Sequence, residues 1–286
     1  MAVIRKESFG TLRDGRSVEL YTLRNTKGTE VKIITYGARL ISWRFMTRKF
    51  EFVNVLQGYP ELSSYEEDTT SRGAVANDAG EDGSDFGHQL WEAEETYEGL
   101  RLTLGNSPEE GGLRVSVLYG LSNDNELSIR YEAETEEERA WDLTGHVRFC
   151  LAGAEDADSV KQIQFFADAS EERDEGRAVE WILRDKPAEV EMELGMFGYD
   201  PGCPIDYLEG GLKNGAEIRD EKTGILLQTY TTQPRLRFCG TPGHENGETR
   251  FETRGSFSLT AQSAPGARLK KGETWKAQTI YVLKAK

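Results

Sequence analysis

The sequence predicts an all-β fold in the form of a large antiparallel β-sandwich. Three observations lead to this prediction: many short segments alternate apolar and polar residues, turn residues separate these segments, and no long segment has helical periodicity. Hydrophobic residues make up 37% of the 286 residues, which suits sheets with one face in water. Because no linker or internal repeat divides the chain, we expect residues 1–286 to form a single domain.

Hairpin patterns recur along the chain. The clearest covers 113–133 around a Ser-Asn-Asp-Asn turn, and a second covers 216–230 with its turn at 220–224. Residues 61–68 are expected to form a short helix. The Gly- and Asp-rich segment 69–86 has little to bury and predicts a mobile loop. Further strands are expected at 18–24, 29–45, 91–104, 160–167, 179–183, 188–194, 236–239, 255–262 and 274–283.

The charge and the cysteine and histidine usage exclude several classes of protein. A formal charge of −15 repels phosphate backbones, so a nucleic acid is not an expected partner. Cys150, Cys203 and Cys239 are odd in number and widely spaced, which fits neither a disulfide framework nor a metal site. The three histidines lack paired spacing, so we expect no metal and no cofactor. No stretch has the length of a membrane span or a signal peptide, and we expect a cytoplasmic protein.

The segment 141–153, WDLTGHVRFCLAG, sets His146 at the start of a strand. A structural histidine within the hydrogen-bond network is one interpretation. The string also resembles the N-L-T-N-H-S-Y-F-N-L-A-G pattern of the aldose 1-epimerase (galactose mutarotase) family. It keeps Leu143, Thr144, His146, Phe149, Leu151, Ala152 and Gly153. The resemblance extends over nearly all of 9–283 and implies a β-sandwich that acts on a sugar.

Mutarotation opens a sugar hemiacetal and recloses it on the other face. A base takes the proton of the anomeric hydroxyl, and an acid protonates the ring oxygen. In the family the base is a glutamate and the acid is the histidine that His146 matches. The resemblance further implies sugar-binding roles for Asp206 in PIDY, for Gln233 in YTTQP and for Arg72. Asp206 and Gln233 are also ordinary turn residues in such strings, and that interpretation stays open.

Two positions depart from the family pattern. Gly80 stands where a second histidine belongs, and Thr260 stands where the glutamate base belongs. Asp78 falls where the family has its second arginine. A threonine hydroxyl does not lose its proton usefully at neutral pH, so a carboxylate of the 69–86 loop is a candidate substitute base. The candidates are Glu81, Asp82 and Asp85, although charged loops are usually only solvated.

These residues predict a divergent aldose 1-epimerase-like protein with weak mutarotase activity. It would act on or bind a small-molecule sugar in a cleft lined by His146, Asp206, Gln233 and Thr260, as a monomer or homodimer. One alternative is a non-catalytic carbohydrate-binding or regulatory protein; another is a sugar isomerase or lyase with a rebuilt pocket. A phosphosugar would require arginines at the cleft, and strand parity leaves the direction of the candidates open. These candidates are Arg148, Arg235 and Arg237, whereas His88 and His244 match no family position.

Overall fold

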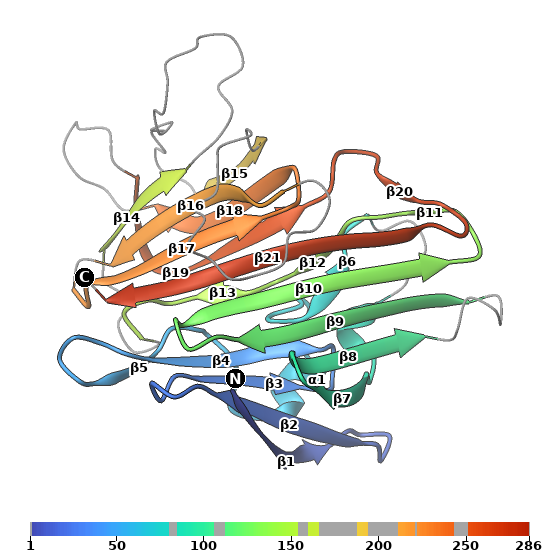
Figure 1. Cartoon of the computed structure of the whole chain (residues 1–286), viewed down its shortest axis with the longest axis horizontal. Helices are drawn as coiled ribbons and strands as arrows, with labels where there is room; N and C mark the ends of the chain where they lie inside the picture. Colours follow the sequence, from blue (N-terminus) through green and yellow to red (C-terminus); the bar gives the residue numbers. More distant parts are fainter. Residues whose placement is uncertain are drawn as a thin grey trace, which may run out of the picture.

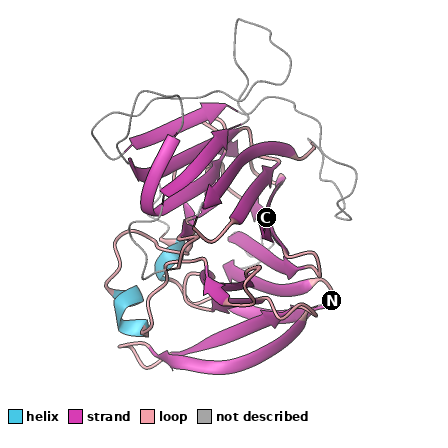
Figure 2. Ribbon diagram, turned by 90° about the vertical axis from the view of Figure 1, so that its left-hand side faces the viewer, coloured by secondary structure: helices cyan, strands magenta, loops and turns pink. Residues whose placement is uncertain are grey.

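The computed structural model describes residues 2–79, 85–105, 112–153, 160–165, 188–193, 211–220, 222–242 and 251–285. Nearly all regular structure in these ranges is β-strand, and every strand pairing in them is antiparallel (Figure 2). The all-β class predicted from alternation is therefore confirmed.

A five-stranded sheet forms the N-terminal part of the molecule, drawn in blue in Figure 1. Its strands pair in chain order: β1 (Val3–Thr11), β2 (Ser17–Arg24), β3 (Glu30–Ile34), β4 (Arg39–Met46) and β5 (Phe52–Asn54). The sequence did not predict β1. This strand lies at the sheet edge and is mostly exposed, so it has no apolar alternation to reveal it.

A twelve-stranded sheet forms the other layer. Its two long central strands, β19 and β21, contain twelve residues each. The order is β15 (Ala188–Glu193), β18 (Arg235–Pro242), β19 (Phe251–Gln262), β14 (Val160–Phe165), β16 (Lys213–Asp220), β17 (Ile225–Thr231), β21 (Thr274–Ala285), β10 (Glu126–Thr135), β9 (Leu113–Leu121), β8 (Gly99–Gly105) and β7 (Glu92–Thr96), with β13 (Arg148–Phe149) paired to β19.

Both predicted hairpins are present. Residues 122–125 join β9 to β10, and the chain turns from β16 into β17 at Gly224, whose N–H donates to Asp220 O at 2.9 Å. The charged segment 134–139 joins two strands: β10 ends at Thr135, and Arg139–Ala140 forms β11, which pairs with β20 (Arg268–Leu269). The predicted strand at 179–183 lies outside the described residues.

Short elements connect the two sheets near the site described below. β6 (Val75–Asn77) pairs with β12 (Leu143–Gly145) in a small two-stranded sheet. The helix α1 (Leu62–Glu66) confirms the short helix expected at 61–68, and a 3₁₀ turn, η1, covers Phe86–His88.

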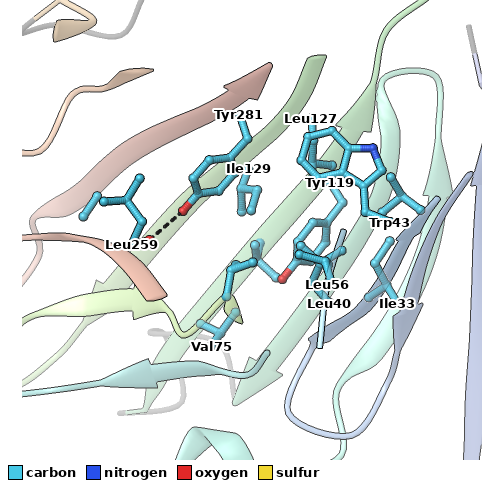
Figure 3. Close-up of a cluster of buried hydrophobic side chains, with 14 of the residues drawn as sticks. Ile33, Leu40, Trp43, Leu56, Val75, Tyr119, Leu127, Ile129, Leu259 and Tyr281 are labelled. Atoms are coloured by element: carbon cyan, nitrogen blue, oxygen red, sulfur yellow. Dashed lines mark hydrogen bonds between the residues drawn. The ribbon is translucent and has the colours of Figure 1, made fainter. Parts of the chain in front are cut away.

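The largest hydrophobic cluster lies between the sheets. It contains Trp43 of β4 and apolar residues of the larger sheet, including Tyr119, Leu127 and Leu259 (Figure 3). The buried phenols find backbone acceptors, because the Tyr119 hydroxyl donates to Ala38 O at 2.8 Å and the Tyr281 hydroxyl donates to Leu259 O at 3.1 Å. Each large apolar side chain buried here stabilises the fold by roughly 1.5–3 kcal/mol, so the core fixes the position of the strands that bear the site.

Candidate functional site

Strand parity gives β18 and β19 one apolar face and one polar face. Leu236, Phe238, Phe257 and Leu259 belong to the core, so the residues between them point the other way. Residues directly opposite one another in an antiparallel pair share a face, and here Thr260 lies opposite Arg237, Gln262 opposite Arg235 and Ser258 opposite Arg148. We call this surface the polar floor, and it consists of Arg148, Arg235, Arg237, Ser258, Thr260 and Gln262.

The three arginines considered for a phosphosugar are therefore all on the face that carries Thr260. Arg148 is tied down there, because its Nε donates to Ser256 Oγ at 2.8 Å and to Gln57 Oε1 at 3.1 Å. Gln262 is 4% exposed, and its Oε1 has no hydrogen-bond partner among the described residues. The floor thus combines a cation held in place, Arg148, with a buried amide oxygen, Gln262 Oε1, that has no partner among the described residues.

His146 lies between β12 and β13, beside this floor. Arg148 and Phe149 pair with Ser258 and Phe257 of β19, so His146 lies two residues from one end of this ladder and Thr260 lies two residues beyond Ser258 on the partner strand. Thr144, two residues before His146, joins β12 to β19, because its Oγ1 donates to Ala261 O at 2.7 Å. These contacts hold the segment of His146 next to the strand of Thr260, the two positions that the family resemblance assigns to acid and base.

The backbone of His146 is fixed by two consecutive residues. His146 N donates to Ala74 O at 2.9 Å, and Gly73 N donates to His146 O at 2.7 Å. Two residues facing one is the arrangement of a β-bulge, which re-aims a side chain. Gly73 has φ +73°, and a Cβ there would lie 2.4 Å from Leu40 O, so only glycine fits this position without strain.

The imidazole of His146 contacts a carboxylate that sequence reasoning did not select. Its Nε2 lies 2.8 Å from Asp78 Oδ1, and the side chains are 25% and 21% exposed. Asp78 occupies the position of the second arginine of the family pattern. This reversal of charge is the sequence signal that could have identified Asp78 as a site residue. An anion at this position can accept a hydrogen bond from the imidazole, which an arginine cannot do.

A second carboxylate lies next to this pair. Asp142 Oδ1 accepts a hydrogen bond from Ser263 N at 2.7 Å, and Asp142 O accepts one from Asp78 N at 2.9 Å. Burial raises the pKa of Asp142, and the negative charge of Asp78 raises it further, against the lowering effects of Ser263 N and Arg235. Asp142 stands where the family pattern has asparagine, so this end of the site has gained negative charge.

Gln233 is buried and ties strands together. It is 3% exposed; its Nε2 donates to Leu143 O and Ala261 O at 3.2 Å each, and its Oε1 accepts from Ser263 Oγ at 3.2 Å. These bonds connect the strand before His146 to the strand of Thr260. Its predicted contact with sugar hydroxyls stays a prediction, but its part in positioning β12 on β19 is direct.

Arg72 lies beside the segment that holds His146. Its guanidinium carbon is 4.4 Å from the centroid of the Tyr59 ring, and its Nε is buried without a partner among the described residues. It precedes Gly73 directly, so it is close to the imidazole-bearing segment along the chain. Its role as a sugar ligand remains a prediction.

The acidic candidates of the 69–86 loop separate into two groups. Asp85 Oδ2 contacts His88 Nδ1 at 2.5 Å, and His88 Nε2 contacts Asp68 O at 2.9 Å. Asp85 is thus committed to His88 instead of His146. Several predicted residues lie outside the described residues: Gly80, Glu81, Asp82, Asp206 and His244.

Hydrogen bonds connect the described residues of the 69–86 segment to the rest of the chain, and the mobility expected from its composition stays a prediction. The Arg39 guanidinium, fully buried, donates to Asp68 Oδ2 at 3.1 Å, to Arg72 O at 2.7 Å and to Gly87 O at 3.1 Å. Val75 N donates to Gly37 O and Asp78 N to Asp142 O. The composition of a segment indicates how little apolar area it can bury. It does not reveal that a buried arginine will donate hydrogen bonds to residues at both ends of the segment.

The described residues contain no group of three or more His, Cys, Asp or Glu side chains arranged for a metal ion. Within the same ranges, no helix is both long and apolar enough to cross a membrane.

The sequence is similar to that of known proteins from one family. The family model described as Aldose 1-epimerase matches residues 19–80 and 78–282. The chain is similar to the aldose 1-epimerase of Escherichia coli K12, with 25% identity over 79% of each chain, and to the galactose mutarotase of Rattus norvegicus, with 26% identity over 93% of this chain and 92% of that one.

Solved structures share the fold. An aldose epimerase homologue from C. elegans superposes with a TM-score of 0.68 at 15% identity, covering 100% of this chain and 99% of that one. A galactose 1-epimerase from Lactobacillus acidophilus NCFM gives a TM-score of 0.68 at 16% identity, covering 99% of both chains. With the family model matched over most of its length, the chain belongs to the aldose 1-epimerase family.

Proposed function

We propose that this protein binds an aldose sugar beside His146 and interconverts its anomers slowly. The observation that carries this proposal is that the segment of His146 lies beside β19: β13 pairs with β19, and Thr144 Oγ1 donates to Ala261 O at 2.7 Å. An imidazole that is partly exposed and held by backbone bonds suits the acid that protonates the ring oxygen. The hydroxyl of Thr260, in the place of the base, supports a rate below that of family members with the glutamate.

Polarimetry on freshly dissolved α-glucose or α-galactose tests the activity. We expect a rate above buffer but below that of an aldose 1-epimerase that has the glutamate, because losing the family's base from its own position costs up to about 10²–10⁴-fold, less where another group takes the proton. His146→Ala should abolish the residual rate. His244→Ala, at a histidine without a family counterpart, serves as the matched control.

A sugar-binding protein without turnover is the second candidate, and Thr260 is the observation that favours it. Calorimetric titration of the same sugars separates the two functions. Binding without any rate above buffer supports the binding protein, and a residual rate removed by His146→Ala supports the enzyme. Running glucose 6-phosphate in parallel tests whether Arg148, Arg235 and Arg237 on the polar floor select a phosphosugar.

A further inference from the structure

The contact between Asp78 and His146 supplies a carboxylate at the place where the reaction requires one. Both side chains are partly exposed, so a ligand can reach them. The backbone of Asp78 is held rigidly: its N–H donates to Asp142 O at 2.9 Å, while the neighbouring Asn77 accepts from Asp142 N at 2.8 Å and donates to Ala140 O at 3.1 Å. With its backbone held by these hydrogen bonds, the Asp78 carboxylate lies beside the acid in a position suited to proton transfer.

We propose that Asp78 is the general base of this protein and replaces the glutamate that Thr260 has displaced. The inference rests on the proposed function, since it names the base of the same reaction. Asp78 is a catalytic residue on this account, because its carboxylate would contact the anomeric hydroxyl directly.

The geometry of a hemiacetal fits a base and an acid that lie side by side. The anomeric hydroxyl oxygen and the ring oxygen are bonded to the same carbon, so they are close neighbours. Asp78 Oδ1 and His146 Nε2 lie 2.8 Å apart, and such a pair can address both oxygens at once.

The proton transfers balance without any further reactant. Asp78 takes the proton of the anomeric hydroxyl while the His146 imidazolium gives its Nε2 proton to the ring oxygen. The bond between the anomeric carbon and the ring oxygen breaks, and the carbonyl forms. After rotation the steps reverse: the ring oxygen attacks the other face of the carbonyl, its proton returns to His146, and Asp78 returns its proton to the anomeric oxygen.

Other described carboxylates near this segment are already engaged. Asp142 Oδ1 accepts from Ser263 N, Asp85 contacts His88, and Asp68 is buried against Arg39. None of these has a hydrogen bond to His146 in the described residues. Asp78 is therefore the carboxylate that the structure offers to the acid.

Asp78→Asn separates a base from a residue that only orients the imidazole. The amide oxygen can still accept a hydrogen bond from Nε2, but it cannot take a proton. We expect mutarotation to fall about 10²–10⁴-fold relative to the wild-type excess over buffer, with sugar affinity from calorimetry retained. Asp78→Glu keeps a carboxylate and should retain measurable activity, and Asp85→Asn, at a carboxylate bound to His88, should have the wild-type rate.

A second variant restores the base elsewhere. Thr260→Glu in the Asp78→Asn background should recover part of the lost rate, whereas Thr260→Gln, of similar size, should not. An Asp78→Asn rate within about twofold of wild type, with His146→Ala inactive, would overturn this inference and leave the proposed function standing. A wild-type chain without any rate above buffer would overturn the enzymatic function and this inference together.

Discussion

At the scale of single residues, three aspartates around the site differ in what they touch, and this decides what each can do. Asp78 contacts the imidazole of His146 and is partly exposed. Asp142 is half-buried against Ser263 N. Asp68 is buried in an ion pair with Arg39. Only the first can exchange a proton with a ligand; the other two determine stability and its dependence on pH.

Asp142→Asn should stabilise the protein at neutral pH. The pKa of Asp142 is raised in the folded state by burial and by Asp78, so the folded chain binds more protons than the unfolded chain above the ordinary aspartate pKa of about 3.9. The free energy of unfolding therefore falls as the pH rises from the ordinary aspartate pKa through the raised pKa of Asp142, and it stays lowered at pH 7. Asparagine keeps an acceptor for Ser263 N without this cost.

Urea denaturation at pH 7 and pH 3 measures the effect. The midpoint of Asp142→Asn should exceed that of the wild type at pH 7 and match it at pH 3. Asp124→Asn, at an exposed aspartate, is the control and should leave both midpoints unchanged. A lower midpoint for Asp142→Asn at pH 7 would contradict this assignment.

At the scale of elements, the strands that carry the site are short and depend on their neighbours. β12 and β13 have three and two residues, and His146 lies in the gap between them. Gly73 and Ala74 bridge that gap from the other side, and Leu40 of β4 donates to Gly73 O at 2.9 Å. The direction of the imidazole is thus set by a chain of backbone bonds that runs from the five-stranded sheet.

Gly73→Ala should disrupt this chain of bonds. The new Cβ meets Leu40 O at 2.4 Å, and φ +73° is strained for alanine. The strain alone costs about 1–3 kcal/mol, and the clash adds to it and displaces His146. Gly266→Ala has nearly the same φ, +71°, with open space around its Cβ, so it isolates the strain. The measurements are the free energy of unfolding and the mutarotation rate; equal losses in the two variants would show that contact with Leu40 has no effect.

At the scale of the whole molecule, a buried ion pair connects the five-stranded sheet to the site. Arg39 and Asp68 are 0% and 1% exposed as side chains. Burial alone would raise the pKa of Asp68, but hydrogen bonds from Thr70, Arg72 N and Arg39 outweigh it and lower the pKa. This stabilisation is present above the ordinary aspartate pKa and is lost as the pH falls through the lowered value.

Arg39→Leu should cost about 3–5 kcal/mol, because it leaves the Asp68 charge buried without its partner. The double variant Arg39→Leu/Asp68→Leu should recover much of this loss. Arg16→Leu breaks an exposed pair with Asp14, 51% exposed on both sides, and should cost less than about 1 kcal/mol. Chemical denaturation measures all three; a cost for Arg39→Leu no larger than that of Arg16→Leu would show that the pair does not stabilise the attachment of the Asp68 segment to the five-stranded sheet.

Most of the sandwich could be predicted from sequence, because alternation and turn residues report directly on half-buried strands such as β9 and β10. The exposed edge strand β1 could not, since it buries too little to leave a pattern. In the site, His146 and Thr260 follow from the family strings. Asp78 does not, because its contact with His146 depends on a bulge and a turn between residues 68 positions apart.

A crystal structure with a saturating aldose is the most direct test of where the chemistry takes place. We predict the sugar on the polar floor, with its anomeric and ring oxygens within hydrogen-bond reach, about 2.6–3.2 Å, of Asp78 and His146. Thr260 should face the same ring without taking a proton from it. A sugar bound away from His146, or a His146–Asp78 pair that stays closed at saturating sugar, would contradict the account.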